Sequence, residues 1–398
     1  MNGALSGYRI IDLTSVVLGP YAMQILGDHG ADVIKVESPE GDLVRQIGSG
    51  RTAGMGPIHL QVNRNKRSIV LDIKKPEGRT ALLRLAETAD VFVHSMRPQA
   101  IQSLGLGDAE LRAVNPRIVH AGAYGFRADG PYGAKPAFDD VIQGISGLAD
   151  IIGRQAGGPR YAPTIMADKT TGLTLAYALL AALLHRERTG HGQRIEVPMF
   201  ETMVSFLMIE HLWGRTLDPL HGEIGYNRVL SPERKPYPTR DGHICLLPYT
   251  DRQWQSFFAI AGRPEIISDP RFCDLNTRAR NIAELYAEAA KLTPARDTEE
   301  WMALLEPLGV PVTRINRLQD LLLDPHLVAG GMFFETEHPS EGRMLNVAPP
   351  VTLAASPAAI RRPAPRLGQH TVEILNEAGY DADDIAAMLA ARCAIQAA

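Results

Sequence analysis

The chain has 398 residues, of which 45% are hydrophobic and 22% are charged, and its formal net charge is −4 at pH 7. This length exceeds one ordinary core, so we expect two domains, or one large domain with an insert. The near-neutral charge provides no basic field, which argues against nucleic acid or an anionic membrane surface as a partner.

The compartment is indicated by cysteine usage and by what the N-terminus lacks. Cys245, Cys273 and Cys393 lie far apart, with neither C-x-x-C spacing nor a disulfide framework, as is typical of a reducing cytosol. No basic region followed by an apolar one marks a signal peptide, and no apolar run approaches the ~20 residues that span a bilayer. We therefore expect a soluble, cytoplasmic protein.

Short strand-like runs alternate with helices in the first half of the chain. Strands are expected at 8–13, 31–37, 68–73, 90–94, 117–121 and 193–197, with a helix at 19–27 between the first two. This alternation predicts an α/β fold with a parallel sheet. The first turn, at 14–20, lacks G-x-G-x-x-G, so it has no phosphate cradle for a nicotinamide or flavin.

A polar and basic segment at 63–67 precedes the third strand. Such a cluster is typical of a solvated turn, and the alternative is an anion site at the mouth of the sheet. Ser95, Met96 and Arg97 follow the strand at 90–94 and are expected on that same edge.

The second half indicates a smaller unit followed by a return to the first. A long apolar helix at 199–213 precedes a linker at 214–231, and Asp241-Gly242 predicts a hairpin turn. Helices are expected at 251–261, 276–292, 298–305, 369–378 and 383–392, with strands near 310–314, 331–335 and 342–346. We expect a large domain from 1–213 and 325–398 and a small domain at 232–324.

Carboxylates are the chemistry-bearing residues that remain after other motifs are excluded. The sequence has no H-E-x-x-H metal motif, no G-x-S-x-G elbow and no P-loop. Asp168 stands before an apolar helix expected at 172–185, where it is either an N-cap or a nucleophile kept ionised by the helix macrodipole. Asp139 and Asp140 are interpreted as helix caps.

An ordered set of motifs resembles the class III CoA-transferase family, which includes formyl-CoA and carnitine CoA-transferases and α-methylacyl-CoA racemases. The motifs are 11–14 (IDLT), 19–20 (GP), 26–37 (LGDHGADVIKVE), 63–69 (NRNKRSI), 97–98 (RP), 137–143 (AFDDVIQ), 163–172 (PTIMADKTTG), 188–193 (RTGHGQ) and 363–370 (PAPRLGQH). The resemblance implies a Rossmann-like large domain made from both chain ends, a smaller α+β domain and an interlocked homodimer.

The resemblance also implies a site. Asp168 matches the family's catalytic aspartate, no cofactor would be bound permanently, and coenzyme A or acyl-CoA would be the substrate together with a free carboxylic acid. The residues implied to contact CoA are Val16, Leu71, Lys74, Ser95, Met96, Arg97, Lys135 and Phe138.

The implied reaction is CoA transfer to a small dicarboxylic or hydroxy acid through an aspartyl-CoA thioester on Asp168. Arg234, Lys235 and Arg240 could pair with a second carboxylate, although a solvated surface is the alternative. The racemase motif Gly-His-Asp is replaced by 137–139 (AFD), which removes the imidazole. A racemase that uses only carboxylates and a non-catalytic CoA-binding protein are the competing hypotheses. The family arginine after the R-P-G motif is replaced by Ser103, and 227–235 stands where formyl-CoA transferases have a glycine run.

Overall fold

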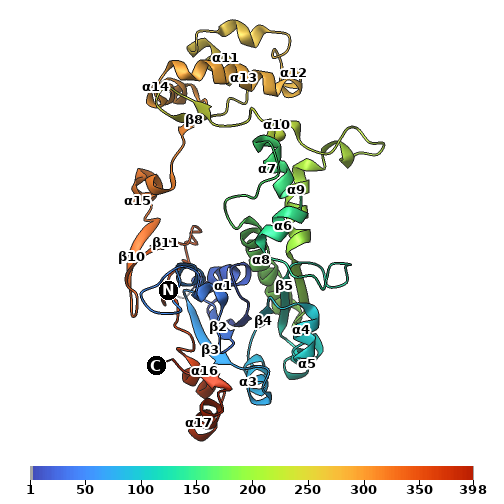
Figure 1. The fold of residues 1–398 in the computed structure, drawn as a ribbon, viewed down its shortest axis with the longest axis vertical. Coiled ribbons are helices and arrows are strands. Elements are labelled where there is room, and N and C mark those ends of the chain that lie inside the picture. The colour runs from blue at the N-terminus through green and yellow to red at the C-terminus, as the bar shows by residue number, and fades with distance from the viewer. Residues whose placement is uncertain (1–2, 398) are drawn as a thin grey trace. The chain divides into compact units, whose positions relative to one another are not determined.

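The computed structural model describes residues 3–397 (Figure 1). Main-chain contacts divide the chain into two compact units. The first runs up to Ser146, resumes at Pro163–Phe206 and continues from Val328 onward, whereas the second comprises Gly147–Ala162 and Leu207–Leu327. Residues from both halves of the chain therefore build the first unit.

The first unit contains a seven-stranded sheet in the order β12-β3-β2-β1-β4-β5-β6. Its strands are β1 (Arg9–Leu13), β2 (Asp32–Glu37), β3 (Lys66–Leu71), β4 (Val91–His94), β5 (Val119–Tyr124), β6 (Arg194–Pro198) and β12 (Ala394–Ile395). All neighbours pair in parallel except β12, which pairs antiparallel with β3. The predicted α/β fold with a parallel sheet is confirmed, and the order of β1–β6 is that of doubly wound nucleotide-binding sheets.

Helices cover both faces of this sheet. On one face the alternate side chains Ile11, Ile34, Ile69 and Phe92 are fully buried in a cluster with helices from both chain ends. These helices are α3 (Pro76–Ala86), α4 (Pro98–Ser103), α5 (Asp108–Val114), α16 (Thr371–Glu377) and α17 (Ala382–Ala390). The other face packs against α1 (Leu18–Asp28) and α8 (Met166–Thr189), which contact each other along their lengths (Figure 1).

The interpretation of 63–67 as a solvated turn is wrong, and so is the alternative of an anion site. Strand β3 already begins at Lys66, and Lys66 and Arg67 are buried. Lys66 Nζ lies 3.0 Å from Asp12 Oδ2, and Arg67 Nη2 lies 2.6 Å from Asp32 Oδ2. These cations neutralise carboxylates of the neighbouring strands, so the cluster serves the sheet.

The remaining elements of the first unit lie around the sheet. They include η1 (Leu43–Arg45), α2 (Pro57–Val62), α6 (Asp139–Ile145) and the antiparallel pair β10 (Phe333–His338) and β11 (Gly342–Val347). The strands expected near 331–335 and 342–346 are confirmed. Helices α9 (Met199–His211) and α15 (Pro325–Ala329) span two of the four boundaries between the units along the chain. Within the described residues, no helix combines the length and the apolar character needed to cross a membrane.

The second unit has its own core around Trp254, Phe257 and Trp301. Its sheet, β7 (Tyr237–Pro238), β8 (His243–Leu246) and β9 (Val312–Arg314), is antiparallel and contains the predicted Asp-Gly hairpin. Its helices are α7 (Leu148–Ala156), α10 (Asn227–Leu230), α11 (Asp251–Ile260), α12 (Leu275–Arg280), α13 (Ile282–Leu292) and α14 (Thr298–Leu305), with short helices η2 (Trp213–Thr216), η3 (Pro264–Ser268), η4 (Thr293–Ala295), η5 (Glu306–Leu308) and η6 (Leu318–Leu323).

The unit boundaries differ from the expected ones, and 207–213, expected in the large domain, belongs to the second unit. Residues 147–162 belong to the second unit, where Gln155 Nε2 donates to Val229 O over 2.8 Å. The expected linker at 214–231 also lies in the second unit and carries part of η2 and all of α10. The ring of Trp213 stacks on Tyr226 with centroids 4.5 Å apart, so this segment has packing of its own. The helix expected at 276–292 is two helices, separated at Asn281.

Candidate active site

A cleft of about 390 Å³ opens where β1, β2, β3 and β4 end. Its walls are 13–15 after β1, 35–42 at and after the end of β2, 71–74 after β3, and Ser95 and Met96 after β4. The strand order reverses between β1 and β4, because later strands are added on one side of β1 and then on the other. Ligands of open α/β sheets bind in the crevice at such a reversal point, so this cleft is the expected ligand site.

The sequence-predicted CoA contacts are only partly brought together. Leu71, Lys74, Ser95 and Met96 line the cleft. The Lys74 side chain is exposed and forms no hydrogen bond or salt bridge with any other residue of 3–397. An unpaired ammonium at a nucleotide-type crevice is suited to a phosphate group.

The other four predicted contacts lie outside the cleft walls. Arg97 Nη1 donates to Ala134 O over 3.3 Å, and Lys135 Nζ stands 4.0 Å from the centre of the Tyr132 ring. Arg97 therefore lies beside the segment that carries Lys135. Val16 lies in the turn between β1 and α1. Phe138 is the N-cap of α6, and its side chain is 62% exposed.

Asp168 is the third residue of α8, which begins at Met166, six residues before the expected start. The N-cap interpretation is wrong, because Ile165 occupies that position and no side chain caps the helix. Only 7% of Asp168 is exposed. Burial and the neighbouring charge of Asp139 raise the pKa of Asp168 to about 7, so the expected stabilisation of its ionised form by the helix terminus is outweighed.

Asp139, on α6, holds the start of α8 by accepting a hydrogen bond from the backbone of that helix. Its Oδ1 accepts from the Asp168 backbone N–H over 2.9 Å, and its Oδ2 accepts from Gln143 Nε2 over 2.5 Å. Asp139 and Asp140 are the first two residues of α6 and do not cap it, which corrects the capping interpretation. Within residues 3–397, no group of three or more His, Cys, Asp or Glu side chains is arranged to hold a metal ion.

The start of α8 lies directly against the start of α1. A Cβ atom placed on Gly172 would stand 2.7 Å from the Leu18 carbonyl oxygen, and one placed on Gly19 would overlap the Thr14 side chain. Real Cβ atoms do not approach other heavy atoms this closely, so a larger residue at either position would force its neighbour to move. Because Asp168 lies one helical turn before Gly172, this packing brings it near the turn that leads from the cleft into α1.

That turn contains a strained residue. Val16 has φ = +66°, and of the four non-glycine residues with positive φ in residues 3–397 it is the only β-branched one. The left-handed region is sterically unfavourable for a branched side chain and costs on the order of 1–3 kcal/mol unless the surroundings impose it. Such strain is often found at functional sites, and here it lies beside the cleft.

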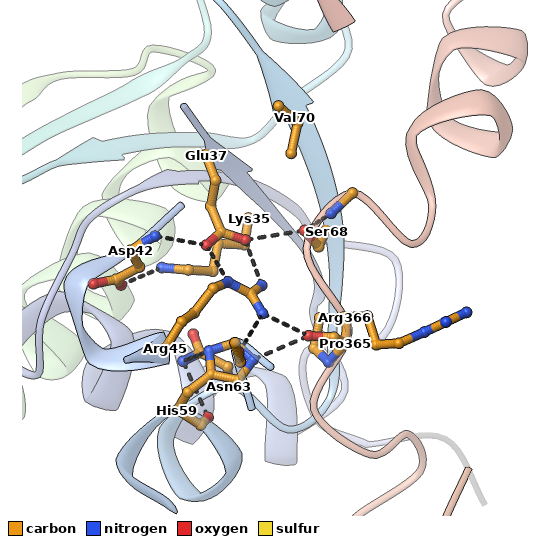
Figure 2. A network of polar contacts seen from close by, with 12 residues as sticks. Lys35, Glu37, Asp42, Arg45, His59, Asn63, Ser68, Val70, Pro365 and Arg366 are labelled. Carbon is orange, nitrogen blue, oxygen red and sulfur yellow. Dashed lines mark hydrogen bonds and ion pairs between the residues drawn. The ribbon is translucent and has the colours of Figure 1, made fainter. Parts of the chain in front are cut away.

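Buried polar side chains support the loop after β2 that forms one wall of the cleft (Figure 2). Glu37 accepts from Arg45 Nη2 over 2.6 Å and from Ser68 Oγ over 3.0 Å, and Arg45 Nη1 donates to Pro365 O over 3.2 Å. Burial opposes ionisation of Glu37, but Arg45 and Lys35 outweigh it and lower the pKa of Glu37 to about 2. The wall is thereby tied to β3 and to the C-terminal segment.

This network was missed at the sequence level. Lys35 and Glu37 alternate with apolar residues in the run 33–37 (VIKVE), and Lys35 is fully buried. Charged residues inside a run that reads as a fully buried strand were the available signal, because such residues need partners. Their partners Asp42 and Arg45 come from the following loop, and spacing alone does not identify them.

A doubly wound α/β unit with a crevice at its strand reversal, next to a buried carboxylate, defines a nucleotide-type ligand site with an acidic centre. The sequence profile described as CoA-transferase family III matches residues 5–371. The chain belongs to this family and is a CoA-transferase enzyme.

Relatives and solved structures agree with this assignment. The chain is 32% identical to succinyl-CoA:glutarate CoA-transferase of Homo sapiens, over 97% of this chain and 89% of the relative. It is 31% identical to formyl-CoA:oxalate CoA-transferase of Escherichia coli O6:H1, over 98% of this chain and 99% of the relative. The crystal structure of Rv3272 from M. tuberculosis superposes with a TM-score of 0.81 at 30% identity, covering 93% of this chain and 98% of that one.

Proposed function

We propose that the enzyme moves CoA from an acyl-CoA donor to a free carboxylic acid through a thioester on Asp168. The observation that carries the proposal is the buried Asp168 carboxylate, whose pKa is raised to about 7 next to Asp139 and beside the turn that leaves the cleft. The nucleotide end of CoA would lie at Leu71 and Lys74, and the thioester would reach the turn containing Val16.

The proposed reaction balances without a cofactor. The Asp168 carboxylate forms a C–O bond to the acyl carbon of the donor, and the C–S bond of the donor thioester breaks. The products are a mixed anhydride and CoA thiolate. The thiolate then attacks the aspartyl carbonyl and displaces the donor carboxylate, leaving an aspartyl-CoA thioester. The acceptor carboxylate attacks the aspartyl-CoA thioester, which forms a second anhydride and expels CoA thiolate. This thiolate then attacks the acyl carbon of the acceptor, which releases the new acyl-CoA and regenerates the Asp168 carboxylate.

The electrostatics of the carboxylate pair favour these intermediates. Two ionised carboxylates repel each other when they share a buried site. Both the anhydride and the thioester are neutral at Asp168, so acylation removes the repulsion by Asp139. The same intermediates hydrolyse readily, and the burial of Asp168 limits the access of water to them.

The acceptor is proposed to be a small dicarboxylic or hydroxy acid. Support comes from the names of the two relatives, which carry the dicarboxylates glutarate and oxalate. Of the three candidate cations, Arg240 pairs with Asp297 over 2.7 Å and Lys235 with Glu233 over 3.1 Å. Arg234 forms no salt bridge within the described chain and lines a pocket of about 260 Å³ in the second unit.

A homodimer is part of the proposal. Leu173, Tyr177, Leu180 and Leu184 recur at helical spacing along α8, and each is at least 42% exposed. They form one apolar stripe opposite the residues that α8 buries. An exposed apolar stripe of this kind usually marks an interface, and a second copy of the chain is the proposed occupant.

Mass spectrometry of the peptide that contains Asp168 tests the mechanism. The enzyme is mixed with a panel of acyl-CoAs that includes succinyl-CoA, then digested. We expect a CoA or acyl adduct that disappears in Asp168→Ala and persists in Asp140→Ala, since Asp140 is an exposed acid on the first turn of α6. No adduct with any donor, combined with deuterium exchange at the α-carbon, would favour the racemase. Binding of CoA without either signal would favour a non-catalytic protein.

A further inference from the structure

The turn between β1 and α1 is held in place by side chains from outside it. The backbone N–H of Val16 donates to Asp42 Oδ1 over 3.0 Å, and Lys35 Nζ donates to Thr14 O over 3.0 Å. Lys35 Nζ also donates to Asp42 Oδ2 over 2.9 Å. The Lys35 ammonium and the Asp42 carboxylate thus hold the two ends of the segment 14–16. Between them, Ser15 N donates to Ser95 Oγ over 3.1 Å.

The Lys35–Asp42 pair is fully enclosed. The Lys35 side chain is 0% exposed and the Asp42 side chain 2%. Burial alone would lower the pKa of Lys35, but Asp42, Glu37 and Asp12 outweigh it and raise that pKa, so Lys35 stays charged although it is buried. A buried ion pair contributes little net stability compared with well-packed apolar residues, so its value lies in the geometry that it imposes.

That geometry matters because of where the turn lies. Thr14 and Ser15 line the cleft, and the Leu18 carbonyl, at the end of the same turn, packs against Gly172. Gly172 lies one helical turn after Asp168. A shift of the turn would therefore change the distance between a thioester that enters from the cleft and the carboxylate of Asp168.

We propose that Asp42 and Lys35 are positioning residues that hold Val16 in the left-handed conformation and thereby set the thioester against Asp168. The pair takes no part in bond making. The inference rests on the proposed function, since it assumes that Asp168 is the nucleophile.

The test is a rescue experiment on the full-length enzyme. In Asp42→Asn the carboxamide offers one acceptor and one donor, so it satisfies either Val16 N–H or Lys35 but not both. Because misplacement by about 1 Å can cost 10²-fold in rate, we expect kcat to fall by ~10–100-fold with a smaller change in KM for acyl-CoA. Adding Val16→Gly should recover at least a third of the decrease in log kcat, because glycine adopts positive φ without strain.

A matched control separates positioning from general destabilisation. Asp28 forms a comparable buried pair with Arg64 over 2.7 Å and does not contact the turn. Val16→Gly should not restore Asp28→Asn, and restoration of both variants would overturn the proposal. An unchanged kcat in folded Asp42→Asn, or no restoration by Val16→Gly, would also overturn it.

Two further measurements keep the inference testable by itself. If Asp42→Asn does not fold, hydrogen exchange of the Val16 amide in the unmodified enzyme decides the matter. Slow exchange, comparable to that of the amides of β1, supports the proposal that Asp42 and Lys35 hold Val16 in place. Exchange at the rate of an open loop overturns it. Absence of any Asp168 adduct in the unmodified enzyme would refute the proposed function, whereas an adduct that forms equally fast in Asp42→Asn would refute the positioning role alone.

Discussion

Replacing Asp139 with asparagine removes the charge next to Asp168 and keeps the local shape. The carboxamide oxygen of the new side chain can still accept from the Asp168 backbone N–H. Gln143 Nε2 donates to both Asp139 Oδ2 and Thr164 O, and the bond to Thr164 O can persist in the variant. Burial of Asp168 is unchanged. The substitution therefore isolates the repulsion between the two carboxylates from the other cause of the raised pKa.

The magnitude follows from the titration of Asp168. Its pKa is about 7 with Asp139 present, and burial is the larger of the two causes. A group of pKa ~7 is roughly 10% ionised near pH 6, and lowering that pKa by about one unit makes it roughly 50% ionised. If ionised Asp168 is the nucleophile, Asp139→Asn should raise kcat/KM near pH 6 by about fivefold for the first such unit and by about a further twofold for a second, with little change at about pH 9.

The assay is the pH profile of kcat/KM for acyl-CoA from about pH 5 to about pH 9. We expect its acidic limb to move to lower pH in Asp139→Asn and to stay in place in Asp140→Asn, since Asp140 is exposed. An acidic limb that does not move, or that moves to higher pH, would refute the reasoning.

The same pKa has a consequence for folding. The native state holds a proton on Asp168 that the unfolded chain, with an ordinary Asp pKa of 3.8, has already lost. The free energy of unfolding should therefore fall as pH rises from about 4 to about 7, by at most on the order of 4 kcal/mol for three pKa units. Asp168→Asn should remove this fall in denaturant titrations across that pH range.

Three further predictions concern packing, CoA binding and assembly. Gly172→Ala should lower the free energy of unfolding by about 1–3 kcal/mol because its Cβ meets the Leu18 carbonyl, whereas Gly144→Ala on α6, where no atom lies within 4 Å, should raise it by about 0.5–1 kcal/mol in denaturant titrations. Lys74→Ala should raise KM for acyl-CoA by ~5–30-fold in steady-state assays, whereas Lys75→Ala, whose ammonium bonds Ala391 O, should change it little. If the proposed homodimer forms through the α8 stripe, Tyr177→Glu should convert it to a monomer in sedimentation experiments. A Tyr177→Glu enzyme that sediments like the unmodified one would show that the stripe is not the interface.

The parts of the fold that could be predicted are those with local signals. The strands at β1, β2 and β4 are short apolar runs between turn residues, and both hairpins have glycine at the turn. The start of α8 could not be found in this way, because Ile165 at its N-cap offers no polar capping side chain. Strand β12 has only two residues, too few for any periodicity.

The candidate site was predictable only in part. Asp168 and the cleft residues at the ends of β3 and β4 follow from motif resemblance and chain order. The role of Asp139 does not, because its partner is a backbone N–H of another helix 29 positions away. The same holds for Lys66, whose carboxylate partner is 54 positions distant. Long-range pairing of buried charges depends on the assembled sheet.

The pairing of β12 with β3 supports one wall of the cleft, because β12 bonds the strand that carries Leu71. Cys393 O accepts from Asp72 N over 2.8 Å, and Ala394 pairs with Leu71, three residues before Lys74. Without β12, the wall that carries Leu71 and Lys74 would lack its outer neighbour in the sheet. A change at Ala394 or Ile395 would therefore act on the cleft from the edge of the sheet, although neither residue lines it.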